Sequence, residues 1–303
     1  MRAVTFSEYG DPDVLHVAEV DEPHPGPGQV RIAVRAAGVN PIDWKARSGM
    51  MREVMPLSLP VIDGREAAGV IDEAGPGVTD WAAGDEVFGF AVAGAAADYA
   101  VLDDVARKPP GLSWEEAAAL PVAAETSVRV FNVLGGLGAG QTIVIDGAAG
   151  GVGSVAVQLA IARGARVIGT ASERNHEFLR SLGAEPTTYG PGLVERVRAL
   201  APEGVDAGFD TAGQGAVPDL IELTGDPARV ASIADFGAAA LGAKVTGGSD
   251  GRATEALAEA AELADAGRLR PFVAQAFTFA DAPEAHRVSQ AGHVRGKLVL
   301  VPG

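Results

Sequence analysis

Hydrophobic runs in the middle of the chain alternate with amphipathic stretches, a pattern typical of a parallel β-sheet covered by helices. Residues 142–145 form a short run of apolar and β-branched side chains, as expected of a strand buried on both faces, and residues 167–169 form a second one. Between them, the spacing of the apolar positions predicts a helix from about residue 152 to 163. Because the alternation continues to about residue 247, we expect a doubly wound α/β sheet here.

The first 118 or so residues have a different pattern, with short alternating runs and frequent turns. After a turn-rich segment at residues 21–28, residues 30–35 alternate apolar and non-apolar positions, which predicts a strand with one buried face. Similar short runs recur at residues 69–72, 86–90 and 97–102. These runs favour an antiparallel, barrel-like domain.

Between Pro109 and Pro121, a helix is expected to connect the two domains. Ser113 and Glu116 have the spacing of a capping box, in which each side chain accepts a hydrogen bond from the other residue's backbone. This helix therefore has a defined start.

The end of the chain predicts two helices and a strand. An Ala- and Glu-rich helix is expected at residues 251–267, a second helix from about Ala280, and a final strand at residues 297–301. We place one domain at residues 1–120, rejoined by residues 270–303, and the sheet domain at residues 121–269.

Composition narrows the class of protein. At 303 residues the chain is long enough for two full cores. The formal net charge of −16 argues against nucleic acid as a partner, because a phosphate backbone is bound through basic patches. No uncharged run is long enough to span a membrane, and the first residues lack an apolar signal segment, so we expect no membrane partner and a cytoplasmic protein.

A glycine-rich turn follows the strand predicted at residues 142–145. Ala148, Gly150 and Gly153 give the A-x-G-x-x-G form of a dinucleotide-binding turn. Gly150 lets the backbone approach a pyrophosphate, and Gly153 allows close packing of helix on strand. Gly151 and Val152 start the helix, whose first amides and dipole favour an anion. A glycine run alone could be an ordinary flexible turn, but the flanking strands and helix favour a nucleotide.

The choice of nicotinamide cofactor depends on the end of the second strand. NAD-specific sheets keep an acid there, which binds the ribose hydroxyls and repels a 2′-phosphate. In this chain that position falls at or near Ala171. Because Ser172, Arg174 and His176 follow it, we predict that they receive the 2′-phosphate of NADP(H). The alternative for Arg174 is a solvated helix start.

Five separated motifs occur in the order of one known family: GVNPID at residues 38–43, GREAAGV at 64–70, GDEVFG at 84–89, the A-x-G-x-x-G turn, and GHVRGK at 292–297. On these motifs the whole chain resembles the medium-chain dehydrogenase/reductase superfamily, and within it the zinc-less quinone oxidoreductases. The resemblance implies a GroES-like β-barrel domain that bears the substrate side and a Rossmann domain that binds NADP. It further implies a cleft between them and usually a homodimer.

The resemblance also bears on metal binding. Zinc-dependent members of the superfamily have a cysteine where this chain has Asn40 and a histidine where it has Arg65, and their structural zinc uses four cysteines. This chain has no cysteine, and its histidines lack the spacing of a metal triad. The histidines are residues 16, 24, 176, 286 and 293, and we expect them to be surface or capping residues. We therefore predict a metal-free enzyme.

In this family the segment after Asn40 lines the cleft, so the resemblance makes Asn40, Asp43 and Lys45, with Arg47, candidates for polarising a substrate oxygen. Asn40 is the best of them by motif match. Many relatives carry a tyrosine as proton donor where this chain has Met51, and a neighbouring tyrosine of some quinone reductases aligns with Lys45.

A second part of the site is expected near the nicotinamide. Thr126 matches a threonine that the family places there, whereas relatives mostly have an apolar residue where this chain has Glu125. NADPH-dependent relatives commonly have a lysine at the position of His176.

The leading hypothesis is an NADPH-dependent, zinc-independent oxidoreductase that transfers a hydride to a small molecule, either a quinone or an α,β-unsaturated carbonyl. Two alternatives stay open. An alcohol dehydrogenase lacks its zinc ligands in this sequence, and an NADPH-binding sensor or structural protein is compatible with the absent tyrosine.

Overall fold

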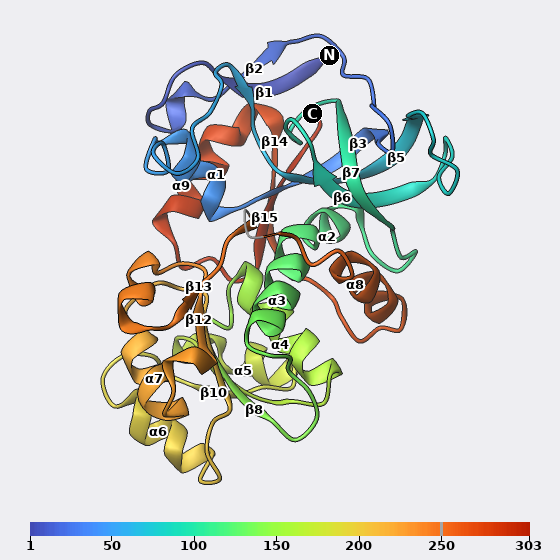
Figure 1. Cartoon of the computed structure of the whole chain (residues 1–303). Helices are drawn as coiled ribbons and strands as arrows, with labels where there is room; N and C mark the ends of the chain where they lie inside the picture. The colour runs from blue at the N-terminus through green and yellow to red at the C-terminus, as the bar shows by residue number, and fades with distance from the viewer. Residues whose placement is uncertain (249–250) are drawn as a thin grey trace. The chain divides into compact units, whose positions relative to one another are not determined.

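The computed structural model describes residues 1–248 and 251–303. The chain forms two compact units (Figure 1), of which the first comprises Met1–Val122 with Leu257–Gly303 and the second comprises Ala123–Ala256. The chain thus returns to the first unit at residue 257, whereas the sequence placed this return at residue 270. The helix in between belongs to the first unit, and an apolar stripe on a helix does not reveal which core it joins.

The first unit contains a six-stranded sheet in the order β14-β15-β3-β5-β6-β7. Its strands are β3 Val30–Val39, β5 Glu66–Ala74, β6 Glu86–Ala91, β7 Tyr99–Arg107, β14 Val273–Thr278 and β15 Lys297–Val301. Neighbours are antiparallel except β14 and β15. Because β3 also pairs with β7, the strands from β3 to β7 close on themselves, as the predicted barrel requires.

A smaller antiparallel sheet and the helices complete this unit. The sheet has the order β2-β1-β4, with β1 Arg2–Phe6, β2 His16–Glu19 and β4 Val61–Ile62. The helices are α1 Pro41–Arg47, α2 Trp114–Ala118, most of α8 Ala256–Asp265, and α9 Ala282–Ala291, with short 3-10 turns η1 Pro12–Val14 and η6 Phe279–Asp281. The capping box is confirmed, since Ser113 N donates to Glu116 Oε2 at 2.9 Å and Glu116 N to Ser113 Oγ at 3.2 Å.

The second unit is a parallel sheet in the order β10-β9-β8-β11-β12-β13. Its strands are β8 Thr142–Asp146, β9 Arg166–Thr170, β10 Glu185–Thr187, β11 Ala207–Asp210, β12 Val230–Ser232 and β13 Lys244–Val245. Counted along the chain, this is the 3-2-1-4-5-6 order of a Rossmann sheet, so the doubly wound prediction is confirmed. The order reverses between β8 and β11, where ligands of such sheets bind.

Helices cover both faces of this sheet. They are α3 Pro121–Val133, whose first two residues belong to the first unit, α4 Gly151–Ala162, α5 His176–Ser181, α6 Leu193–Leu200 and α7 Val217–Thr224, with 3-10 segments η2 Glu173–Asn175, η3 Pro227–Arg229 and η4 Phe236–Leu241. Buried side chains of α6 and α7 join Val144, Ile168 and Val230 in one core, and α4 lies on the other face (Figure 1). In the described part of the chain, no helix is long and apolar enough to cross a membrane.

A buried ion pair ties the first unit together. Lys297 Nζ lies 2.6 Å from Glu66 Oε1, with the two side chains 4% and 0% exposed. The other carboxylate oxygen of Glu66 accepts a hydrogen bond from Val122 N at 2.7 Å. An added Cβ on Gly38 would collide with the same carboxylate, so β3 passes directly over it. The pair therefore links β5, β15 and the start of α3.

We predict that Lys297→Met lowers the free energy of unfolding by about 3–5 kcal/mol, because it leaves the Glu66 carboxylate buried without its cation. Urea unfolding measures this, and the double variant Glu66→Gln with Lys297→Met should recover most of the loss. Lys108→Met is the control: Lys108 pairs with the half-exposed Glu86, so about 1 kcal/mol or less is expected. Equal losses of unfolding free energy in the two lysine variants would show that the buried pair of Lys297 contributes no more than the pair of Lys108 with the half-exposed Glu86.

Candidate functional site

The glycine-rich turn lies between β8 and α4, at the carboxyl edge of the parallel sheet. Gly147 opens the turn in the left-handed region, with φ +74°, and Gly150 is the N-cap of α4. Ala148 is buried, and its amide donates to Thr170 O at 3.0 Å, which fixes the turn to the neighbouring strand. Gly151 starts α4, so the first amides of the helix have no intrahelical acceptor and can bind an anion.

The two glycines of the fingerprint differ in what surrounds them. An added Cβ on Gly153 would collide with Gly147 O and stand 2.8 Å from Ala148 Cα, so the protein's own packing requires a glycine there. On Gly150 the same Cβ would meet a single atom within 4 Å, Gly147 O at 3.3 Å. Packing therefore constrains Gly150 less than Gly153, because its added Cβ would make one tight backbone contact and no collision.

The predicted 2′-phosphate residues follow β9. Ala171 is buried at the strand end, and Ser172 is the half-buried N-cap of η2. Arg174 is exposed and has no hydrogen bond or ion pair within residues 1–248 and 251–303. His176 is half-buried, and its Nε2 lies 3.3 Å from Ala171 O, so that ring nitrogen already has a backbone partner. Ser172 Oγ accepts from Asn175 Nδ2 at 3.3 Å and keeps its own hydroxyl hydrogen, so Arg174 is the exposed cation of the three with no partner among the described residues.

A row of polar side chains ends four neighbouring strands of this sheet, and the sequence analysis did not find it. Thr170 Oγ1 donates to Asp146 Oδ1 at 2.5 Å, and Ser232 Oγ donates to Asp210 Oδ2 at 2.7 Å. Asp146 and Asp210 are in register on β8 and β11, the strands that flank the reversal of strand order. In the sequence, each of these four residues is a polar residue that directly follows a short run of apolar or small residues, and this pattern could have identified them.

Glu125 forms a buried ion pair on α3, which accounts for a residue that the sequence left without a role. Arg129 Nε donates to Glu125 Oε1 at 2.8 Å, and Ala253 N donates to the same oxygen at 3.3 Å. Arg129 also contacts Thr246 Oγ1 at 2.6 Å and Thr126 Oγ1 at 3.4 Å. The predicted Thr126 is therefore buried beside this pair, which fastens α3 to segments that follow β13.

Asn40 precedes α1, and its amide is committed inside the first unit. Its Nδ2 donates to Glu66 Oε1 at 2.7 Å, and its Oδ1 accepts from Lys297 Nζ at 2.5 Å. Only 3% of the residue is exposed. In this geometry Asn40 supports the buried ion pair, and its freedom to hydrogen-bond a substrate oxygen is limited to one remaining amide hydrogen.

Asp43 is also buried and holds the start of α1. Its Oδ2 accepts from Asn40 N at 2.7 Å, and its Oδ1 lies 3.3 Å from Arg65 Nε. Burial, followed by the charge of Asp63, raises the pKa of Asp43 to about 6, although Arg65 acts in the opposite direction. Asp43 therefore orients backbone and Arg65, and it can take up a proton near neutral pH.

Lys45 lies on the same helix with its ammonium 5.8 Å from the centre of the Trp44 ring. The side chain is half-buried, and its ammonium makes no hydrogen bond or ion pair with another described residue. Met51, which stands where relatives carry a tyrosine, is half-buried in the turn after α1. Lys45 is thus the uncommitted member of the three predicted catalytic residues.

Two expectations about this region are wrong. His286 is fully buried, not at the surface: its Nε2 lies 2.9 Å from Asp63 Oδ2, and Arg47 Nε donates to its Nδ1 at 3.3 Å. Arg47 is fully buried as well and cannot line a cleft. Burial lowers the pKa of His286, but the charge and hydrogen bond of Asp63 and the charge of Asp43 together raise it, so the net direction is upward. His286 and Arg47 are buried because α9 packs against α1 and covers polar groups that lie far apart in the sequence.

The donor groups at the zinc positions of relatives do not fit that metal. Asn40 offers an amide and Arg65 a guanidinium, and Glu66 is engaged by Lys297 and by Val122 N. Within the described residues, no group of three or more His, Asp or Glu side chains is arranged to hold a metal ion.

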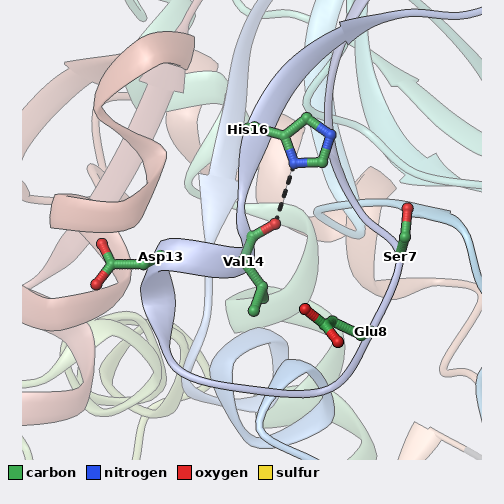
Figure 2. A pocket seen from close by; sticks show the side chains of 5 residues that line it. All are labelled: Ser7, Glu8, Asp13, Val14 and His16. Atoms are coloured by element: carbon green, nitrogen blue, oxygen red, sulfur yellow. Dashed lines mark hydrogen bonds between the residues drawn. The ribbon is translucent and has the colours of Figure 1, made fainter.

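A surface hollow in the first unit lies apart from these residues. Figure 2 shows its lining side chains, with His16 Nδ1 3.1 Å from Val14 O. The lining residues are Ser7, Glu8, Asp13, Val14 and His16. None of the predicted site residues is among them, so the hollow is not the candidate active site.

We predict that Gly150→Val abolishes nicotinamide dinucleotide binding while the protein stays folded, because the branched side chain enters the space beside the turn rather than the core. Gly153→Val is the matched control and should lower stability, because its side chain meets backbone. Calorimetric titration and thermal unfolding measure the two effects. Undiminished binding by a folded Gly150→Val protein would show that the dinucleotide does not use this turn.

Family models match two parts of the chain. Residues 26–110 match an alcohol dehydrogenase GroES-like domain, and residues 182–300 match a zinc-binding dehydrogenase domain. Among solved structures, the quinone oxidoreductase from Coxiella burnetii is similar over 100% of this chain and 99% of its own, with a TM-score of 0.83 and 29% identity.

Curated relatives point the same way. A mitochondrial NAD(P)H oxidoreductase of Danio rerio is 32% identical over 354 residues, covering 99% of this chain and 91% of the relative. A chloroplastic quinone-oxidoreductase homolog of Spinacia oleracea is 39% identical over 196 residues, or 61% of this chain and 60% of the relative. The chain spans 13% and 5% of two polyketide synthase proteins of Streptomyces to which it is also similar. The chain therefore belongs to the medium-chain dehydrogenase/reductase superfamily, in its quinone-oxidoreductase-like branch.

Proposed function

We propose that the protein is an NADPH-dependent, zinc-independent oxidoreductase that reduces a quinone or an α,β-unsaturated carbonyl. The observation that carries the proposal is the turn before α4, where an added Cβ would meet one backbone atom at 3.3 Å on Gly150 but would collide with backbone on Gly153. This is the arrangement needed for a pyrophosphate at the start of a helix.

The preference for NADPH is supported by the strand end at β9. No acid stands there to bind the ribose hydroxyls, and Ala171 is followed by Ser172 and the exposed Arg174. His176 contributes less, because its ring already contacts Ala171 O. Arg174 is therefore the proposed principal contact of the 2′-phosphate.

The chain's own side chains then have to polarise the substrate oxygen, because the donor set around Glu66 does not fit zinc. A bound nicotinamide supplies the hydride. Lys45 is the proposed hydrogen-bond donor to the oxygen, since its ammonium is uncommitted. Asn40 and Asp43 are proposed to position it, because both hold the start of α1.

The decisive experiment follows NADPH absorbance with a panel of quinones and enones, with and without a chelator. Turnover that is insensitive to the chelator supports the proposal. Chelator-sensitive oxidation of alcohols would identify an alcohol dehydrogenase instead. Binding of NADPH without turnover on any acceptor would favour a sensor or structural protein.

We predict that Arg174→Ala weakens NADPH binding by about 10- to 150-fold, since a hydrogen bond to a charged group contributes roughly 1.5–3 kcal/mol. The affinity for NADH should hardly change, because NADH has no 2′-phosphate. Titrations of both cofactors measure the change in preference, and rising salt should weaken NADPH binding more in the wild type than in the variant.

Arg180→Ala is the matched control, because Arg180 is also exposed on the next helix but pairs with Glu177. It should leave both affinities unchanged. Equal losses for NADPH and NADH in the Arg174 variant would make Arg174 a structural residue. A wild-type preference for NADH would contradict the NADP assignment as a whole.

A further inference from the structure

Asp146 is the last residue of β8, and the glycine-rich turn begins at the next residue. Its carboxylate is buried, and its hydrogen-bond partner is a neutral hydroxyl, Thr170 Oγ1 at 2.5 Å. The same hydroxyl accepts from Gly147 N at 3.2 Å, the first amide of the turn. Thr170 thus connects the carboxylate directly to the backbone that is proposed to approach the pyrophosphate.

The two charged groups that act most strongly on Asp146 are both acidic. Asp210 is in register with it on β11, and Asp219 acts on it from α7. Within the described residues, Asp146 has no ion pair with a lysine, arginine or histidine. Asp210 is better satisfied, because its carboxylate accepts from the amides of Ala212 and Gly213 and from Ser232 Oγ. Asp146 is therefore the carboxylate of this edge whose negative charge is least compensated.

An anion bound at the turn would add negative charge beside this carboxylate. Burial raises the pKa of Asp146 to about 6; the hydrogen bond from Thr170 and the backbone amide of Gly147 oppose the rise, and the charges of Asp210 and Asp219 add to it. A pyrophosphate at the start of α4 acts in the same direction as Asp210, so the bound state holds the proton to a higher pH than the free state.

We propose that Asp146 takes up a proton from solvent when a nicotinamide dinucleotide binds, so that the affinity for the cofactor falls as the pH rises. The inference rests on the proposed function, because it requires the dinucleotide to bind at this turn. The proton neutralises the carboxylate, which then donates or shares a hydrogen bond with Thr170, and no covalent bond other than the O–H bond forms.

The direction of the pH dependence follows from the linkage between proton binding and cofactor binding. Below about pH 6 the carboxyl group is neutral in both states, and above the pKa of the bound state it is ionised in both. Between these limits binding is accompanied by proton uptake, and each pKa unit of difference changes the affinity tenfold. For a difference of about one unit, we expect roughly tenfold tighter binding at pH 5.5 than at pH 8.

The test titrates NAD⁺ and NADP⁺ by calorimetry between about pH 5.5 and 8, in two buffers of different ionisation enthalpy, which counts the protons taken up. NAD⁺ is the decisive probe, because the 2′-phosphate of NADP⁺ itself titrates near pH 6. Proton uptake by the wild type does not depend on any variant and keeps the test valid if a substitution fails to fold.

Asp146→Asn should bind NAD⁺ with an affinity that no longer varies with pH and that exceeds that of the wild type at pH 8. Asp206→Asn is the matched control: its carboxylate accepts from Thr142 N at the opposite end of β8. It should keep the pH dependence of the wild type. Binding of NAD⁺ by the wild type with no proton uptake, or an unchanged pH dependence in Asp146→Asn, would overturn the inference alone. Failure of both dinucleotides to bind at any pH would overturn the proposed function with it.

Discussion

The buried pair of Glu66 and Lys297 is the constraint on which the first unit depends. Two charges are removed from water, so each needs the other and every remaining polar atom nearby must be satisfied. Glu66 therefore also accepts from Val122 N and from the amide of Asn40, which brings the starts of α3 and α1 to one point. The network around this pair therefore fixes the starts of the two helices, while the apolar core packs the rest of the unit.

The parts of the fold that the sequence predicted are those whose signals are local. The strand, glycine turn and helix at β8 and α4 lie within about one span of 20 residues, and the doubly wound class of the sheet follows from repeated alternation of strand and helix. Two features depended on remote contacts. The strand β14 pairs in parallel with β15 inside an otherwise antiparallel barrel, and α8 joins the first unit although it follows the sheet domain in sequence.

The same distinction applies to the candidate site. Gly150 and Gly153 could be recognised because their roles depend on backbone space that the motif itself defines. Asn40 and His286 could not be placed, because whether a polar side chain is buried depends on partners far along the chain: Lys297 for Asn40 and Asp63 for His286. The residue type determines which hydrogen bonds a side chain can make, whereas the fold determines which of them are already formed inside the protein.

The buried carboxylates at the carboxyl edge of the second sheet are satisfied differently from Glu125 in the same unit and from those of the first unit, and this difference bears on how an acidic protein could hold the proposed anionic cofactor. In the first unit, Glu66 and Asp43 each face a cation. At the carboxyl edge of the second sheet, Asp146 and Asp210 face hydroxyls and amides instead. Hydroxyl and amide dipoles satisfy these acids without placing a positive charge beside them. Attraction for a phosphate must then come from the helix amides and from exposed cations such as Arg174.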